Sequence, residues 1–305
     1  MKALTVRIVL AITRWRWVRW LFTGTRVGRR MALRFVAGES LDDAVAAARE
    51  SNEAGMTVSL DHLGEHVTHR DAAESARDDY LACLDRIAAE GLDANISVKL
   101  TQLGLGVDDE LCARSLDALA TRAAELSLTV TIDMEDSAHT AVTLDMYEQA
   151  QKEHGNLGVA IQAYLRRTPD DLRRIAPLGG HIRLCKGAYD EPDDLALQGR
   201  REVDAAFDRL CQTLMEQGDA KPAIASHDDE RIAFAIGLAD GRAAPWEIQM
   251  LYGIREPLQR SLVADGHPLR VYIPYGDAWY PYLTRRIAER PANLWFFVRA
   301  LFGRR

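Results

Sequence analysis

Short apolar runs alternate with helical stretches along most of this chain, and no other feature constrains the fold as strongly. The eight runs occupy residues 56–60, 95–100, 128–133, 157–163, 181–186, 222–226, 246–251 and 269–273. The helical stretches between them occupy residues 72–89, 109–125, 138–153, 169–175, 196–217, 230–238 and 256–263. Strands that alternate with helices form parallel sheets, and eight repeats predict a closed (β/α)8 barrel. A further helix is expected at residues 41–54, with Ser40 as its N-cap and Gly55 as its stop.

The runs end in cations, tyrosines and one acidic cluster. Reactive groups of such barrels lie at the C-terminal ends of the strands. In chain order, the residues at those ends are Asp61, His62, Gly64, Glu65, Lys99, Asp133, Met134, Glu135, Gln162, Tyr164, Arg183, Lys186, Gly187, Tyr189, Ser226, His227, Gln249, Leu251, Tyr272 and Tyr275. A ring of this composition suits an anionic cofactor together with a carboxylate substrate, and we expect no metal site.

A helix is predicted after the eighth run, once Pro274 and Gly276 have broken the strand. One face of this helix carries Tyr282, Arg285, Arg286 and Glu289, which are three, four and seven residues apart. Two adjacent guanidiniums suit a planar carboxylate or a phosphate. The alternative is a solvated helix with an ordinary Arg285–Glu289 ion pair.

Two strand ends carry further chemical signals. Two roles are open for Lys99. It is either a charged lysine among the carboxylates and arginines of the site, or a buried lysine of lowered pKa that forms a Schiff base as in aldolases. The sequence RLCKGAY at 183–189 is more specific. Its Gly187 and Ala188 let the backbone approach a phosphate or a flat ring, and Lys186 adds a mobile positive charge.

Charge is unevenly distributed along the 305 residues. The whole chain has a formal net charge of −7, which gives no bias towards nucleic acid. Residues 1–38 nevertheless carry Lys2 and eight arginines without an acidic residue, so this segment is treated as a unit separate from the barrel domain at 39–305. Its three tryptophans at 15, 17 and 20 beside arginines fit a membrane interface, a helix packed on the core, or a cleaved presequence. The four scattered cysteines indicate reduced thiols in the cytosol.

Several segments resemble the proline dehydrogenase family of flavin enzymes. HIRLCKGAYDE and YGDAWYPYLTRRIAERPAN are similar to its signature segments, and RFVAGESLDDAV, SVKLTQLG, TIDMEDS and AIQAYLRRT follow in the family's order. The resemblance covers roughly residues 34–297. Because the chain has no room for a fused aldehyde dehydrogenase domain, it looks like the monofunctional bacterial form. The resemblance implies a distorted (β/α)8 barrel with N-terminal helices and a final helix over the barrel mouth.

The resemblance also implies roles for individual residues. Arg285 and Arg286 would pair with the proline carboxylate, assisted by Lys99. The pyrrolidine ring would be walled by Leu251, Tyr272 and Tyr282, with Tyr189 nearby. Asp133 would hold the ion-pair network, Arg183 would lie near flavin N5, and Glu289 would fix an arginine. Residues expected to line FAD are Met134, Gln162, Arg183, Lys186, Gly187, Ala188, Ser226 and His227.

The activity implied is FAD-dependent oxidation of L-proline to Δ1-pyrroline-5-carboxylate, the first step of proline catabolism, with electrons passed to a membrane quinone. A separate pyrroline-5-carboxylate dehydrogenase would take up the product. The expected location is the cytoplasm. If electrons pass to a membrane quinone, peripheral attachment to the inner face of the cell membrane is also expected. The alternatives are another barrel flavoenzyme, such as a hydroxyproline dehydrogenase, or a lysine Schiff-base aldolase. Tyr272 is bulky, which favours proline over 4-hydroxyproline as substrate.

Overall fold

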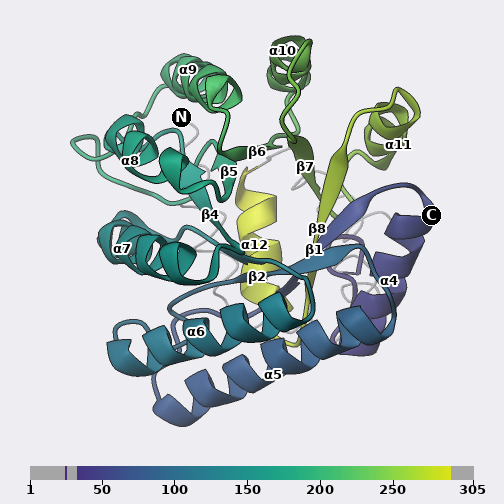
Figure 1. Ribbon diagram of the computed structural model, residues 1–305, viewed down its shortest axis with the longest axis vertical. Helices are drawn as coiled ribbons and strands as arrows, with labels where there is room; N and C mark the ends of the chain where they lie inside the picture. Colours follow the sequence, from purple (N-terminus) through teal and green to yellow (C-terminus); the bar gives the residue numbers. More distant parts are fainter. Residues whose placement is uncertain (1–24, 26–32, 290–305) are drawn as a thin grey trace.

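The computed structural model describes residue 25 and residues 33–289, with the side chains of 285–289 outside the described part. Eight parallel strands form a closed barrel in sequence order, as the eightfold alternation predicted (Figure 1). The strands are β1 (Thr57–His62), β2 (Ala94–Val98), β3 (Val130–Ile132), β4 (Leu157–Gln162), β5 (His181–Cys185), β6 (Lys221–Ala225), β7 (Glu247–Leu251) and β8 (Leu269–Tyr275).

Helices surround this barrel on the outside. They are α4 (Leu41–Glu53), α5 (Arg70–Ala89), α6 (Asp109–Glu125), α7 (Ser137–His154), α8 (Thr168–Ile175), α9 (Arg200–Glu216), α10 (Asp229–Ala239) and α11 (Glu256–Ala264), with a short 3-10 helix, η1 (Ala176–Leu178). The α4 helix begins where the sequence indicates, because Ser40 and Asp43 form a capping box. It packs against β1 and β8, the position that a helix following β8 would take in a regular barrel.

The last helix, α12 (Trp279–Glu289), lies elsewhere. Figure 1 shows it in the middle of the strand ring, viewed along the barrel. The N-terminal end of α12 is tied to the segment before α4, because Trp279 Nε1 donates to Glu39 Oε1 at 3.1 Å. This arrangement confirms a final helix over the barrel mouth. The predicted N-terminal helices fall outside the described residues.

Alternation along the strands separates an apolar shell from a polar barrel interior. Val58, Leu60, Ile96 and Val98 are fully buried and belong to the hydrophobic core. Their neighbours point the other way, since successive side chains of a strand face opposite sides. Inside the barrel the strands therefore contribute mostly polar residues, namely Ser59, Asp61, Asn95, Ser97, Thr131, Arg183, Glu247, Gln249, Arg270 and Tyr272. A polar interior of this kind departs from the branched aliphatic layers usual in these barrels.

Most boundaries lie within about two residues of the prediction, and two of the differences have a clear structural cause. The helix expected from residue 196 begins only at Arg200, because Ala196 forms an antiparallel bridge with Leu165. The eighth strand does not break at Pro274 but continues to Tyr275. Proline is tolerated there because β7 pairs with β8 only as far as Tyr272, while β1 pairs with it to the end.

Two further expectations concern thiols and membranes. All four cysteines are free, as expected, and burial raises the pKa of Cys83, Cys112 and Cys211 to about 12. Among the helices of the described residues, none has the length and apolarity needed to cross a bilayer.

Candidate active site

A cavity of about 800 Å³ opens at the C-terminal ends of the strands. It collects every site residue expected from the sequence whose side chain is described. These residues are Lys99, Asp133, Met134, Gln162, Arg183, Lys186, Gly187, Ala188, Tyr189, Ser226, His227, Leu251, Tyr272 and Tyr282. Tyr282 comes from α12, so this helix supplies one wall of the cavity. The remaining candidates, Arg285, Arg286 and Glu289, lie on α12 with side chains outside the described residues.

Buried charges meet at the floor of the cavity. The ammonium of Lys99 lies 2.8 Å from Asp61 Oδ1 and 3.2 Å from Asp133 Oδ2. Asp133 Oδ1 also accepts from Arg183 Nη1 and from the Ser97 hydroxyl. Asp133 follows β3 and Lys99 follows β2, so parallel strand pairing brings these two residues together. The floor thus holds two cations and two carboxylates.

The protonation states of this cluster are set by mutual contacts. Burial opposes every charge here, but Lys99 and Arg183 together with hydrogen bonds hold the pKa of Asp133 below its ordinary value. In the same way, Asp61 and Asp133 outweigh burial and raise the pKa of Lys99. Burial and the neighbouring carboxylates raise the pKa of Tyr272, whose hydroxyl donates to Asp133 Oδ2 at 2.6 Å. At neutral pH, Lys99 is therefore charged, Asp133 ionised and Tyr272 protonated.

Arg183 is held on several sides within this cluster. Its Nε donates to Gln249 Oε1 at 2.6 Å, and its Nη1 donates to Ser97 Oγ at 2.9 Å and to Asp133. The guanidinium carbon lies 5.1 Å from the centre of the Tyr272 ring. Nη2 is buried and has no hydrogen-bond partner among the described residues. Arg183 therefore lines the cavity with one donor still available.

The loop after β5 forms a second wall. Gly187 has φ +123°, and a Cβ there would overlap the Tyr164 ring, so a side chain is excluded on two grounds. Gln162 fixes the loop by accepting from Ala188 N at 3.3 Å while its amide donates to Glu135 O at 2.8 Å. The backbone at 187–188 is therefore exposed towards the cavity without side-chain bulk.

Two aspartates position the cation of this wall. Lys186 Nζ contacts Asp204 on α9, and it lies 2.8 Å from Asp228 Oδ2 before α10. The hydrogen bond and charge of Lys186 outweigh burial and lower the pKa of Asp228. Next to Asp228, His227 Nε2 accepts from Leu251 N at 3.2 Å, which places the proton of a neutral imidazole on Nδ1.

Sequence reasoning missed several lining residues. Asp61 and Gln249 were expected at strand ends and do line the cavity, but the sequence suggested no individual role for either. Arg200, Val203 and Asp204 enter from α9, and Asp228 and Ile254 enter from the loops after β6 and β7. The first turn of α9 was a weak signal, since Arg200 and Asp204 share one helix face.

Other strand-end residues serve the scaffold. Glu135 lies outside the cavity lining and accepts from Thr101 N at 3.0 Å, which fixes the turn after β2. The rings of His62 and Tyr275 stack with their centres 5.1 Å apart. The histidines at 62, 66 and 69 belong to no metal-like cluster among the described residues.

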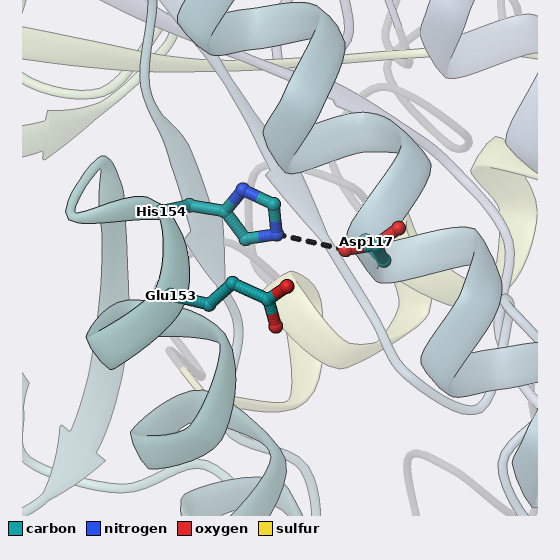
Figure 2. A group of neighbouring side chains, drawn as sticks. All are labelled: Asp117, Glu153 and His154. Carbon is teal, nitrogen blue, oxygen red and sulfur yellow. Dashed lines mark hydrogen bonds and ion pairs between the residues drawn. The ribbon is translucent and has the colours of Figure 1, made fainter.

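One group with metal-like composition occurs far from the cavity. Figure 2 shows Asp117, Glu153 and His154 at the surface, with His154 Nε2 at 2.8 Å from Asp117 Oδ1. His154 ends α7 just before β4 begins, so the group lies at the opposite end of the barrel. Exposed acidic groups beside a histidine are common at protein surfaces, so this composition alone does not make the group a metal site.

Comparison with known proteins agrees with the fold. The family model for proline dehydrogenase matches residues 44–299. Proline dehydrogenase 1 of Bacillus subtilis (strain 168) is 39% identical over 281 residues, covering 91% of this chain and 92% of that protein. Proline dehydrogenase of Deinococcus radiodurans is 35% identical over 280 residues, covering 89% and 90%.

A solved structure shares the fold as well. Proline utilization A (PutA) from Bdellovibrio bacteriovorus, inactivated by N-propargylglycine, superposes with a TM-score of 0.79 at 25% identity. The match covers 86% of this chain but 33% of that longer protein. A family model spans most of the sequence, and relatives that are 35–39% identical align over about nine-tenths of both chains, so this chain belongs to the proline dehydrogenase family.

Proposed function

We propose that the cavity oxidises L-proline to Δ1-pyrroline-5-carboxylate with bound FAD as electron acceptor. The observation that carries the proposal is the juxtaposition of the Lys99–Asp133–Arg183 cluster with the loop at Gly187 in one cavity. The cluster suits an anionic substrate, and the loop suits a large flat cofactor with phosphates. Proline dehydrogenases are oxidoreductases and are generally flavin-dependent, so the proposal adds the identity of the flavin and the roles of the residues.

The residues present fit FAD on structural grounds. The volume of about 800 Å³ lies in the range of cofactor pockets. Gly187 packs directly on the Tyr164 ring behind it, so the cavity wall at this position consists of backbone without a side chain. Arg183 Nη2 is a buried donor that lacks a partner among the described residues, which is costly unless a ligand accepts from it. Residues proposed to hold the cofactor are Met134, Gln162, Arg183, Lys186, Gly187, Ala188, Ser226 and His227.

The substrate end of the site follows from charge and shape. In the proposal, Arg285 and Arg286 bind the carboxylate, and Glu289 fixes one of these arginines. Lys99 contributes a cation that its two aspartates keep protonated. The pyrrolidine ring lies between apolar and aromatic walls, which are formed by Tyr189, Leu251, Tyr272 and Tyr282. A substrate anchored at one end and walled along its ring is oriented for transfer, and orientation supplies much of such a rate.

When bound, FAD supplies a two-electron acceptor for the hydride from proline C5. Three ionisable side chains of the described cavity wall are poor candidates for a strong base. Asp133 is ionised but its pKa is lowered, and the pKa values of Lys99 and Tyr272 are raised. The site therefore binds proline with its amine already deprotonated. The same raised pKa leaves Lys99 charged, so its amine is not available for a Schiff base and the aldolase alternative loses its nucleophile.

Electron transfer to a membrane quinone completes the proposed cycle. The basic, Trp-rich residues 1–30 would attract anionic lipid and bring the enzyme to the inner face of the cell membrane. A separate pyrroline-5-carboxylate dehydrogenase would consume the product. Binding to anionic vesicles tests the first part: a protein that lacks residues 1–30 should lose it, and equal binding by both forms would refute it.

Anaerobic reduction of the bound cofactor tests the proposed reaction. The purified protein should be yellow, and L-proline should bleach its absorption at about 450 nm, as hydride transfer to flavin requires. A second arm with 4-hydroxyproline should bleach more slowly, because the bulky Tyr272 crowds the ring. A colourless protein that borohydride traps covalently with substrate would instead indicate an aldolase.

A further inference from the structure

We infer that Gln249 and Glu247, both inside the barrel on β7, set the orientation of the Arg183 guanidinium. The inference concerns a positioning pair rather than a group that touches substrate, and it rests on the proposed flavin chemistry for its effect on the reaction. Its structural part, the orientation of Arg183, stands on contacts alone.

Gln249 contacts Arg183 directly. Arg183 Nε donates to Gln249 Oε1 at 2.6 Å, and both side chains are almost completely buried, at 4% and 3% exposure. Nη1 of the same guanidinium is fixed by Ser97 and Asp133. Because a guanidinium is planar, partners at Nε and Nη1 determine where Nη2 points. Without Gln249, the guanidinium plane could turn about the Cδ–Nε bond and offer both terminal nitrogens to Asp133.

Strand geometry explains how these two side chains meet. Arg183 is on β5 and Gln249 on β7, with β6 between them. The β6 residues in register are alanines: Ala223 lies opposite Arg183 and Ala225 lies opposite Gln249. Their small side chains leave space for a long arginine and a glutamine to cross in front of β6. A larger residue at either position would separate the pair.

Glu247 in turn contacts the amide of Gln249. An amide can present either its oxygen or its nitrogen to Arg183, so its orientation must be fixed. Gln249 Nε2 donates to Glu247 Oε1 at 2.6 Å, which directs its oxygen towards Arg183. A flipped amide would face the carboxylate with its oxygen and the guanidinium with its NH2 group, which gives two repulsive contacts.

Two basic side chains keep Glu247 ionised. Burial would raise its pKa, but His181 at 3.1 Å and Arg270 at 2.8 Å lower it well below the ordinary value. Glu247 is therefore an acceptor-only carboxylate. The chain of contacts runs from the ionised Glu247 through the oriented Gln249 to Arg183. Arg183 Nη2 is left as the donor without a partner among the described residues, in a residue that lines the cavity.

The test compares Gln249→Met with a matched control, Gln151→Met. Gln151 is also buried and also uses both amide ends, accepting from Leu157 N at 2.8 Å and donating to Leu178 O at 3.1 Å. It lies on α7, away from the cavity lining. Both variants should lower the melting temperature. Only Gln249→Met should shift the midpoint potential of the bound flavin to a more negative value, because Nη2 no longer holds its orientation.

We expect kcat of Gln249→Met to fall about tenfold with KM for L-proline within about twofold, because a charge-assisted contact is lost near the cofactor and not at the carboxylate. A tenfold change in the two-electron equilibrium corresponds to about 30 mV. Glu247→Gln should lower kcat and shift the flavin midpoint potential in the same directions as Gln249→Met, but by a smaller factor, since the Gln249 amide is then free to flip. This second variant keeps the inference testable if Gln249→Met does not fold.

Crystal structures of the two variants provide a readout independent of flavin chemistry. The inference expects a turned guanidinium in Gln249→Met and an unchanged one in Gln151→Met. A guanidinium that keeps its place, or a potential and kcat that move no more than in Gln151→Met, would overturn it. If unaltered protein is not reduced by L-proline, the proposed function fails separately, and the crystal structures still decide whether Gln249 orients Arg183.

Discussion

The hydroxyl of Tyr272 donates a 2.6 Å hydrogen bond to Asp133 Oδ2. Tyr272 lies on β8, the last strand of the barrel, and Asp133 directly follows β3. The same carboxylate bridges Lys99 and Arg183, so Tyr272 joins the ring wall of the cavity to its charged floor. The geometry of the proposed substrate pocket therefore depends on Asp133 remaining ionised, and the contacts of this one carboxylate lead to the first predictions.

Tyr272→Phe should keep the ring wall and remove the hydrogen bond to Asp133. We expect the rate of anaerobic flavin reduction to fall about tenfold, the cost of one hydrogen bond to a charged group. Stopped-flow absorbance measures this rate. Tyr147→Phe is the matched control, because the Tyr147 hydroxyl is buried without a hydrogen-bond partner among the described residues and lies outside the cavity lining. Equal rates for Tyr272→Phe and unaltered protein would remove Tyr272 from the charged cluster's function.

Lys99→Met should leave Asp61 and Asp133 buried without the cation between them. Breaking a buried pair in this way costs about 3–5 kcal/mol of unfolding free energy, measured by urea titration, and KM for L-proline should rise. Lys152→Met is the control, since its pair with Glu148 lies at the surface and should matter little.

The double variant Asp61→Asn with Lys99→Met separates the two effects. It removes a stranded carboxylate, so it should recover part of the lost stability while KM stays high. Recovery of KM together with stability would show that Lys99 supports the fold only.

The pH profile of kcat/KM should rise without a falling limb from about pH 6 to about pH 9, because the site is proposed to bind the free amine of proline and the fraction of free amine increases with pH throughout this interval. The pKa of Asp133 is lowered below its ordinary value of 3.8, so Asp133 is ionised throughout. The pKa values of Lys99 and Tyr272 are raised above 10.5 and 10.0, so both groups keep their protons. A bell-shaped profile with a falling limb in this interval would show that one of these groups titrates as an acid.

Gly187→Ala should reduce retained flavin, because the site combines φ +123° with a collision against the Tyr164 ring. The ratio of flavin to protein after purification measures this loss. Gly91→Ala is a control for a positive φ alone, with φ +63° in the left-handed helical region and open space around the added Cβ. It should cost about 1 kcal/mol of stability and leave the flavin content unchanged. A full flavin content in Gly187→Ala would contradict the close approach of cofactor and loop.

The sequence was sufficient for the barrel and for most of the cavity lining, for a physical reason. Parallel strands place their C-terminal ends on one side, so Lys99, Asp133 and Arg183 could be grouped before any contact was known. The continuation of β8 through Pro274 was missed, because a proline fits in a strand only where a neighbouring strand does not need its N–H group. Here β1 pairs with β8 at Pro274 and β7 does not, which the sequence alone does not show.

Contacts across the barrel were beyond the same reasoning. Gln249 meets Arg183 only because β6 carries alanines between them, and Lys186 meets Asp204 only after α9 has packed. Such contacts depend on strand order and side-chain size together. Local spacing in the sequence contains neither, which is why the Gln249–Arg183 contact and the place of Asp204 in the cavity were found only in the structure.

The most direct test of the central claim is an anaerobic titration of the purified protein with L-proline, followed at about 450 nm, where oxidised flavin absorbs. The proposal predicts that bound FAD is bleached stoichiometrically and that mass spectrometry finds a product two hydrogens lighter than proline. Arg286→Ala should bleach with the same amplitude but only at much higher L-proline concentration. An unaltered protein that retains FAD and is not bleached by saturating L-proline would contradict the account.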